Sequence, residues 1–126
     1  MCYNTHHFTT SSKSTVTYIS IYAEKDVAAY SDIRKKTDIN TITGSLDIIN
    51  NIRGITFRDK VGNGNRRMGV IAQELEPYLP EIVSTDGDGY KSVKYGNLTA
   101  LLIQAVKEQQ EQIEELKEEI KEIKDG

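Results

Sequence analysis

A serine and a lysine stand five residues apart in the segment SDIRKK at residues 31–36. A hydroxyl beside an amine can act as a nucleophile with its general base, and such a pair can cut a peptide bond. The same residues also fit the start of a helix, with Ser31 as the N-cap and Asp32 next to the positive end of the helix dipole. The spacing alone therefore predicts either a Ser-Lys dyad of Ser31 and Lys36 or a capped helix.

The two interpretations require different backbones. On a continuous helix, five residues turn through about 140° at 3.6 residues per turn, which would place Ser31 and Lys36 on different faces. A working dyad therefore requires Ser31 to lie before the helix, on an extended segment. Lys36 must also accept a proton near neutral pH, so its pKa has to fall by roughly 3 from about 10.4. Arg34 and Lys35 supply nearby positive charge, and we expect burial at a subunit interface to supply the rest.

The composition limits the classes of protein that the chain can belong to. Its 126 residues carry 16 basic and 19 acidic side chains, a net charge of −3, and 37% hydrophobic residues without Trp. A domain of this size has a small core, so oligomerisation would add to its stability. The acidic balance argues against a nucleic-acid partner. With one cysteine, Cys2, the chain forms neither an internal disulfide nor a multi-cysteine metal site.

The sequence predicts no membrane, metal or cofactor site. No apolar run reaches the roughly 18 residues of a membrane span, and no signal peptide is recognisable. His6 and His7 lack a nearby carboxylate or cysteine, which favours a solvated tail over a metal site. The acidic turn at residues 86–89 lacks the ligand pattern of a calcium loop. No phosphate-binding glycine loop is present, so we expect no nucleotide and no other cofactor.

The N-terminal part of the chain predicts one strand. Residues 15–23 alternate β-branched and aromatic side chains, and apolar residues fall on both faces. Such a strand needs cover on both sides, which a short segment cannot supply by itself. We therefore expect residues 1–31 to be the end of a larger β-structured protein, or a strand that pairs with neighbouring chains.

Helix and strand patterns alternate through residues 32–96, which predicts a small mixed core. The expected elements are a short helix from Ser45 with Gly54 in the C′ position, hairpin strands at 55–58 and 68–71, a short helix at 72–78, and a tight turn at 86–89. The turn residues Gly, Pro, Asn and Asp separate these elements, as they do in small α+β domains.

The segment from about Asn97 to Lys124 predicts a long helix that Asn97 caps. Its residues at heptad positions a and d are Thr99, Leu102, Val106, Gln109, Ile113, Leu116, Ile120 and Ile123. Past Lys107 every apolar residue is one of these, and a stripe so narrow requires partner helices to bury it. Ile and Leu at these positions, with Gln109 as a polar layer, favour a parallel trimer over a dimer.

The first three turns of this helix predict packing on the protein's own core, through Leu98, Leu101, Ile103 and Ala105. Together these patterns predict an α+β fold with a short N-terminal strand stub, a small helix and hairpin domain, and a long C-terminal helix in a parallel trimeric coiled coil. The expected boundaries are residues 1–31, 32–96 and 97–126.

Three motifs follow one another along residues 29–124. They are Ser31-Asp32-x-Arg34-x-Lys36, then MGVIAQEL at 68–75 with LPEIV at 79–83, then VKY at 93–95 with Leu98 through AVKE at 105–108. In this order they resemble the intramolecular chaperone auto-processing domain of bacteriophage tailspikes and tail fibres. The segment is also similar to the self-cleaving domain of myelin regulatory factor. Three ordered motifs are far more specific than the first motif alone.

The resemblance implies a homotrimeric chaperone that aligns fibre chains, assists their folding and is released by autoproteolysis. Ser31 corresponds to the family's nucleophile and Lys36 to its base, with the cut next to Ser31, at the Ser31–Asp32 bond. Asp32 and Arg34 match positions with an orienting role. Assembly is expected in the host cytoplasm, with the upstream fibre in the virion tail. The expected partners are further copies of the chain and the upstream fibre, with no nucleic acid and no membrane.

The alternative function is a trimeric coiled-coil scaffold or adaptor without enzymatic activity. In that case Ser31 only caps a helix, and the heptad positions alone carry the function.

Overall fold

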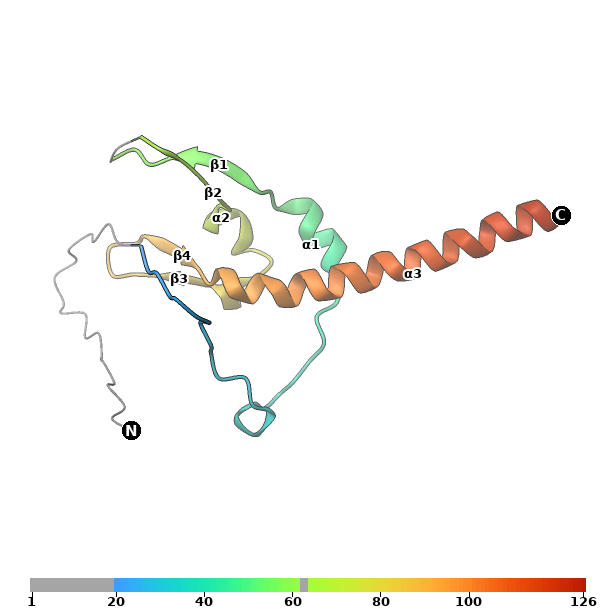
Figure 1. Cartoon of the computed structure of the whole chain (residues 1–126), viewed down its shortest axis with the longest axis horizontal. Coiled ribbons are helices and arrows are strands. Elements are labelled where there is room, and N and C mark those ends of the chain that lie inside the picture. The colour runs from blue at the N-terminus through green and yellow to red at the C-terminus, as the bar shows by residue number, and fades with distance from the viewer. Residues whose placement is uncertain (1–19, 62–63) are drawn as a thin grey trace. The chain divides into compact units, whose positions relative to one another are not determined.

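The computed structural model describes residues 20–61 and 64–126, and the chain divides into two units, Met1–Asp38 and Ile39–Gly126 (Figure 1). In the first unit, residues 20–31 are exposed and form neither helix nor strand, and a single 3-10 turn, η1 (Ile33–Lys35), follows. The expected strand at 15–23 is not formed at residues 20–23, and residues 15–19 lie outside the described residues. A strand needs a partner for its backbone groups, and the described part of this unit contains no other strand.

The second unit contains two small antiparallel sheets and three α-helices among its described residues. Its elements in chain order are α1 (Ser45–Asn51), β1 (Ile55–Arg58), β2 (Arg66–Gly69), α2 (Ala72–Leu75), η2 (Pro80–Ile82), β3 (Val83–Thr85), β4 (Lys91–Val93), η3 (Tyr95–Asn97) and α3 (Leu98–Asp125). Strand β1 pairs with β2, and β3 pairs with β4. The predicted α+β class is confirmed.

The predicted hairpin is formed by β1 and β2, with β2 starting two residues earlier than expected. Ile55 lies opposite Gly69, and Arg58 lies opposite Arg66. This register ends the strand at Gly69 because the next residues lead into α2, where the carbonyl of Ile71 accepts the amide of Glu74 at 3.0 Å. The hairpin therefore joins α2 through a short connection.

The predicted acidic turn connects β3 to β4. Asp86 Oδ1 accepts hydrogen bonds from the amides of Asp88 and Tyr90, both at 2.9 Å. Gly89 has a φ of +86°, a left-handed conformation that glycine adopts without a steric penalty. The carboxylate of Asp86 thus holds the turn itself, as Asx turns do.

Both short helices end earlier than the sequence predicts. Helix α1 ends in a C-cap at Ile52, whose extended backbone leads towards β1, so Gly54 lies beyond the C′ position expected for it. Helix α2 ends at Leu75 rather than at residue 78. Pro77 has no amide hydrogen to continue the helix, and Leu79 N–H closes the segment on the carbonyl of Leu75 at 2.8 Å.

The core lies where α2, η2 and the start of α3 meet. Leu75, Leu79, Ile82 and Leu101 are buried together. Partly buried apolar side chains surround them: Ile42, Ile48, Ile49, Ile52, Val70, Val83, Val93 and Leu98. Helix α1 also packs against α3, and α3 continues well beyond it (Figure 1).

Helix α3 has 28 residues and therefore a length of about 42 Å at 1.5 Å per residue. Asn97 is its N-cap residue, but its side chain makes no capping hydrogen bond. The reason is local: Asn97 has helical backbone angles because the 3-10 turn η3 runs directly into α3. The expected position of the helix is confirmed, whereas the expected side-chain cap is wrong.

Candidate active site

The residues of the predicted dyad lie on either side of the turn η1. Two 3-10 hydrogen bonds fold the backbone between them, from Lys35 N–H to the carbonyl of Asp32 at 3.0 Å and from Lys36 N–H to the carbonyl of Ile33 at 3.1 Å. Ser31 lies before the turn, on the extended segment, and Lys36 is its C-terminal cap. This is the backbone arrangement that a dyad requires, since Ser31 and Lys36 do not share one helix.

Asp32, and not Ser31, caps this turn. Asp32 Oδ1 accepts a hydrogen bond from the Arg34 amide at 2.9 Å, and Asp32 has an extended backbone with φ −70° and ψ 131°. The interpretation of Ser31 as a helix cap is therefore wrong. A carboxylate one residue further along already satisfies the amide that a cap would serve. The Ser31 hydroxyl is not needed for the cap.

Asp32 also binds the side chain of Arg34 through two oxygens. Arg34 Nη2 donates to Oδ2 at 2.8 Å, and Arg34 Nε donates to Oδ1 at 3.1 Å. These side-chain hydrogen bonds, and next the bond from the Arg34 amide, lower the pKa of Asp32 from its usual 3.8. The same contact raises the pKa of Arg34. Arg34 therefore does not act as a free positive charge beside Lys36, as the sequence suggested, because Asp32 matches its charge.

The side chains of Ser31 and Lys36 are both exposed in the single chain. The neighbouring Lys35 ammonium lies 4.8 Å from the centroid of the Tyr30 ring, in a cation–π contact. None of the described residues covers Lys36, so a site that excludes water from it would need a further chain.

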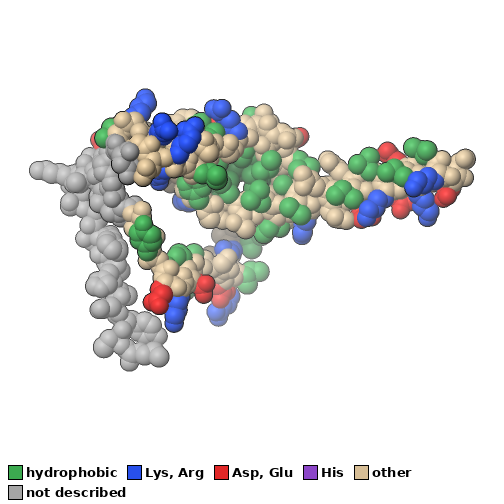
Figure 2. Space-filling view, turned by 45° about the horizontal axis from the view of Figure 1, so that its top comes forward, with side chains coloured by type: hydrophobic (Ala, Val, Ile, Leu, Met, Phe, Trp, Pro, Cys, Tyr) green, Lys and Arg blue, Asp and Glu red, His purple; other side chains and the backbone are tan. Residues whose placement is uncertain are grey.

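Helix α3 has one face in the core and another in solvent. Leu101 is 2% exposed and Ala105 is buried, whereas the neighbouring Leu102 is 51% exposed. The apolar residues at the predicted a and d positions are 46–79% exposed: Leu102, Val106, Ile113, Leu116, Ile120 and Ile123. Thr99 and Gln109 at the remaining such positions are exposed as well. Figure 2 shows hydrophobic side chains along the outer part of α3, between acidic and basic ones.

One residue of the first three turns departs from the prediction. Leu98, Leu101 and Ala105 are partly or fully buried, as expected, but Ile103 is 52% exposed. Two residues turn a helix through about 200°, so Ile103 lies almost opposite to Leu101.

We refer to the exposed apolar residues at a and d positions of α3, from Leu102 to Ile123, as the seam.

Glu108 ties α3 to the start of α1. Its two carboxylate oxygens accept the amides of Ser45 at 2.8 Å and of Leu46 at 2.9 Å. The bond from the Leu46 amide, followed by that from Ser45, lowers the pKa of Glu108. Gly44 is the N-cap of α1 and has no side chain to cap it, so these amides need an acceptor from elsewhere.

Sequence reasoning did not find this contact. In the sequence Glu108 is only the last residue of a motif, and more than 60 residues separate it from its hydrogen-bond partners. The usable signal was Gly44: a helix that begins after a glycine has unsatisfied amides, and a carboxylate is their best acceptor.

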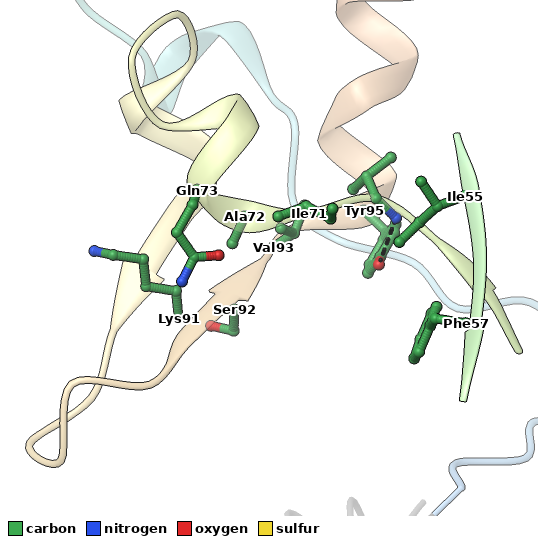
Figure 3. A pocket seen from close by; sticks show the side chains of 10 residues that line it. Ile55, Phe57, Ile71, Ala72, Gln73, Lys91, Ser92, Val93 and Tyr95 are labelled. Carbon is green, nitrogen blue, oxygen red and sulfur yellow. Dashed lines mark hydrogen bonds between the residues drawn. The ribbon is translucent and has the colours of Figure 1, made fainter. Parts of the chain in front are cut away.

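A groove of about 490 Å³ opens between the β1–β2 hairpin, α2 and β4 (Figure 3). Phe57 lies on one wall, and Tyr95 accepts a hydrogen bond from the amide of Val70 at 3.3 Å on its Oη. Lys91 lines the groove, but its ammonium binds the Glu76 carboxylate at 2.7 Å. Ser92 is the hydroxyl side chain on the β4 wall of the groove, and the base nearest to it along the chain, Lys91, is held by Glu76.

Membrane and metal sites were also considered within residues 20–61 and 64–126. No helix there is long and apolar enough to cross a membrane. No three His, Cys, Asp or Glu side chains of this part of the chain are placed to hold a metal ion. His6 and His7 lie outside the described residues.

The chain was compared with known protein families and with known proteins. The family model of the peptidases described as the chaperone of endosialidase matches residues 31–84. Long tail fiber protein Gp37 of Salmonella phage S16 is 37% identical over 111 residues, which cover 80% of this chain and 15% of that protein. The protein of the same name from Escherichia phage AR1 is 33% identical over 93 residues, covering 67% of this chain and 8% of that protein.

A third relative, from Enterobacteria phage M1 and again named long tail fiber protein Gp37, is 36% identical over 99 residues. The match covers 71% of this chain and 39% of that protein. The chain therefore spans less than half the length of each of these relatives. The resemblance found from the motifs is confirmed: residues 31–84 match the model of the chaperone-of-endosialidase family, and the relatives are phage tail fibre proteins.

Proposed function

We propose that this chain is an intramolecular chaperone of a phage tail fibre, which trimerises and then releases itself by Ser-Lys autoproteolysis next to Ser31. The observation that carries the proposal is that the family match begins at Ser31, with Lys36 five residues further on. The relatives, all named as long tail fibre proteins, support a fibre as the folding client. They also support a place for the upstream fibre in the virion tail. Assembly in the host cytoplasm is part of the proposal and stays a prediction.

The seam supports the trimer. Its Ile and Leu side chains are about half exposed or more in the single chain, and partner helices would bury them. Each further helix buries more apolar surface, and each Å² of buried apolar surface contributes roughly 25 cal/mol of stabilising free energy. A trimer holds three client chains together, and this alignment is what a trimerising chaperone contributes to folding.

In the proposed reaction Ser31 Oγ is the nucleophile and Lys36 Nζ is the base, and the Ser31–Asp32 bond breaks. Asp32 and Arg34 orient the pair, because their hydrogen bonds fix the turn between Ser31 and Lys36. The neutral amine of Lys36 is favoured only where water is excluded, and Lys36 is exposed in one chain. Cleavage therefore waits for trimerisation, when neighbouring chains cover Lys36.

Single substitutions test the dyad. We expect Ser31→Ala and Lys36→Ala each to leave a full-length chain that is still trimeric, as measured by intact mass and by light scattering. Lys25→Ala is the matched control: it removes an exposed lysine of the same unit that lies outside residues 31–36, and it should still be cut. Normal fragments from Ser31→Ala or Lys36→Ala would show that the dyad is assigned wrongly.

A variant without the trimer tests the dependence on assembly. Ile113→Asp with Ile120→Asp places charges in two layers of the seam, more than a turn beyond the last buried residue of α3, Ala105. We expect this variant to be monomeric, folded and uncut. Efficient cutting by the monomer would show that a single chain completes the site.

The second candidate is a trimeric scaffold without enzymatic activity. The exposure of Ser31 and Lys36 in the single chain is the observation in its favour. It shares the seam with the first candidate, so the two differ only in whether the purified trimer is cut.

A further inference from the structure

The position of the cut determines whether the attacking Ser31 belongs to the chain that is cut or to a neighbouring chain. This inference rests on the autoproteolysis proposed above. The Ser31 hydroxyl is two bonds from the α-carbon of its own residue. Attack on the carbonyl carbon of Ser31 itself would therefore close a strained four-membered lactone. Attack on the carbonyl carbon of Tyr30 would close a five-membered ring, but that reaction breaks the Tyr30–Ser31 bond. With Ser31 as the nucleophile, a cut between Ser31 and Asp32 thus requires the Ser31 hydroxyl of another chain.

The backbone angles near Ser31 do not favour attack of its hydroxyl on the Tyr30 carbonyl carbon. An ester is less stable than the amide it replaces, so an acyl shift onto the adjacent hydroxyl benefits from strain in the peptide that breaks. Among the described non-glycine residues, only Asp38 has a positive φ, of 52°. Asp32 has ordinary extended angles. The structure therefore shows no stored strain at residues 30–32 that would favour attack within one residue's reach.

The segment is instead open to a second chain. Every residue from 20 to 31 is exposed, and Tyr30 is 91% exposed. The turn after Asp32 is held by the Asp32 carboxylate and by 3-10 hydrogen bonds, so the Ser31–Asp32 peptide lies between an open segment and a fixed one. A second chain can approach this peptide without displacing a buried side chain among the described residues 20–31.

We propose that the active site is shared between chains: Ser31 and Lys36 of one protomer cut the Ser31–Asp32 bond of the next protomer in the trimer. A three-fold arrangement allows each chain to attack its neighbour in one direction round the ring. The site is then incomplete in any single chain. This accounts for a dyad that is exposed when the chain is considered alone.

The steps balance as an acyl transfer followed by hydrolysis. Ser31 Oγ of the attacking chain bonds to the Ser31 carbonyl carbon of its neighbour, while the hydroxyl proton moves to the neutral Lys36 amine. The bond from that carbon to Asp32 nitrogen breaks, and Lys36 returns the proton to this leaving amine. Water then hydrolyses the ester, which restores the hydroxyl and leaves a C-terminal carboxylate on the neighbour's Ser31.

Mixed trimers test this inference. Wild-type and Ser31→Ala chains are co-expressed with different purification tags, so that mixed trimers can be isolated through both tags. The upstream fragments report which chain was cut, because one ends in Ser31 and the other in the substituted alanine. We expect the Ser31→Ala chain to be uncut by itself. In the isolated mixed trimers, formed at equal proportions, it should be cut in up to about two thirds of cases, because about two thirds of its neighbours on the attacking side are then wild type.

Four results are distinguishable by intact mass. Upstream fragments ending in the substituted alanine support attack between chains. Cutting of wild-type chains alone, with Ser31→Ala chains always intact, overturns the shared site and leaves the proposed autoproteolysis standing. An upstream fragment that ends at Tyr30 also overturns it, because the serine has then attacked the preceding carbonyl. If wild-type trimers are not cut at all, the proposed function itself fails.

Discussion

Leu101 and Leu102 are adjacent leucines on α3 that lie on different faces of the helix. Leu101 is 2% exposed and lies in the core with Leu75 and Leu79, whereas Leu102 is 51% exposed and belongs to the seam. Replacing each by alanine removes the same atoms from the same helix. Any difference in stability between the two variants therefore reports on burial and not on helix propensity.

The expected magnitudes follow from this burial. Leu101→Ala removes a fully buried side chain and leaves a cavity, which costs about 3 kcal/mol of the free energy of unfolding. Leu102→Ala removes a side chain that is about half exposed in the single chain, at a cost of about 1 kcal/mol or less. The difference of about 2 kcal/mol corresponds to roughly a 30-fold change in the ratio of folded to unfolded protein.

The assay is urea unfolding followed by circular dichroism, in the monomeric background of Ile113→Asp with Ile120→Asp. With a slope of about 1–3 kcal/mol per M, the unfolding midpoint of Leu101→Ala should lie about 1 M or more below that of Leu102→Ala. In the trimeric background, Leu102→Ala should additionally weaken association. Equal midpoints for the two variants in the monomer would refute the assignment of the two faces of α3.

Two further contacts give predictions within the second unit. Glu108→Gln should lower the unfolding midpoint, because the amides of α1 lose a charged acceptor, whereas Glu111→Gln, one turn further along α3 and exposed, should not. The pKa of Glu108 is lowered from its usual 4.5. The difference in free energy of unfolding between wild type and Glu108→Gln should therefore reach its maximum above pH 4.5 and should vanish as the pH falls through the lowered pKa. Gly69→Ala should cost about 1–3 kcal/mol in urea unfolding, because its Cβ would lie 2.5 Å from Tyr95 Oη. Gly54→Ala, which meets no atom within 4 Å, should be neutral or slightly stabilising; a loss as large as that of Gly69→Ala would contradict the role of Tyr95.

The elements of the second unit were largely predictable, because their signals are local. The apolar spacing in α3 and the Asp86 turn each depend on a few neighbouring residues, and each is present. Local signals also set the limits. Gly54 was assigned to a helix end by its type, but the extended backbone of Ile52 ends α1 first. A strand at 20–23 failed because alternation creates a strand only where a partner strand exists.

The candidate site was predictable in position but not in its contacts. The spacing of Ser31 and Lys36 singled out the segment, yet it could not distinguish a cap from a nucleophile. The structure separates these roles because the Asp32 carboxylate accepts the capping hydrogen bond and also binds the Arg34 side chain. Glu108 was missed because its partners are distant in sequence, and no periodicity connects a residue on α3 with the amides of α1.

The intact mass of the purified wild-type trimer, measured after denaturation, tests the central claim most directly. The account predicts two species, residues 1–31 and residues 32–126, and a single full-length species for Ser31→Ala prepared in parallel. A wild-type chain that stays at its full mass of 14.2 kDa while trimeric would contradict autoproteolysis and would favour the scaffold.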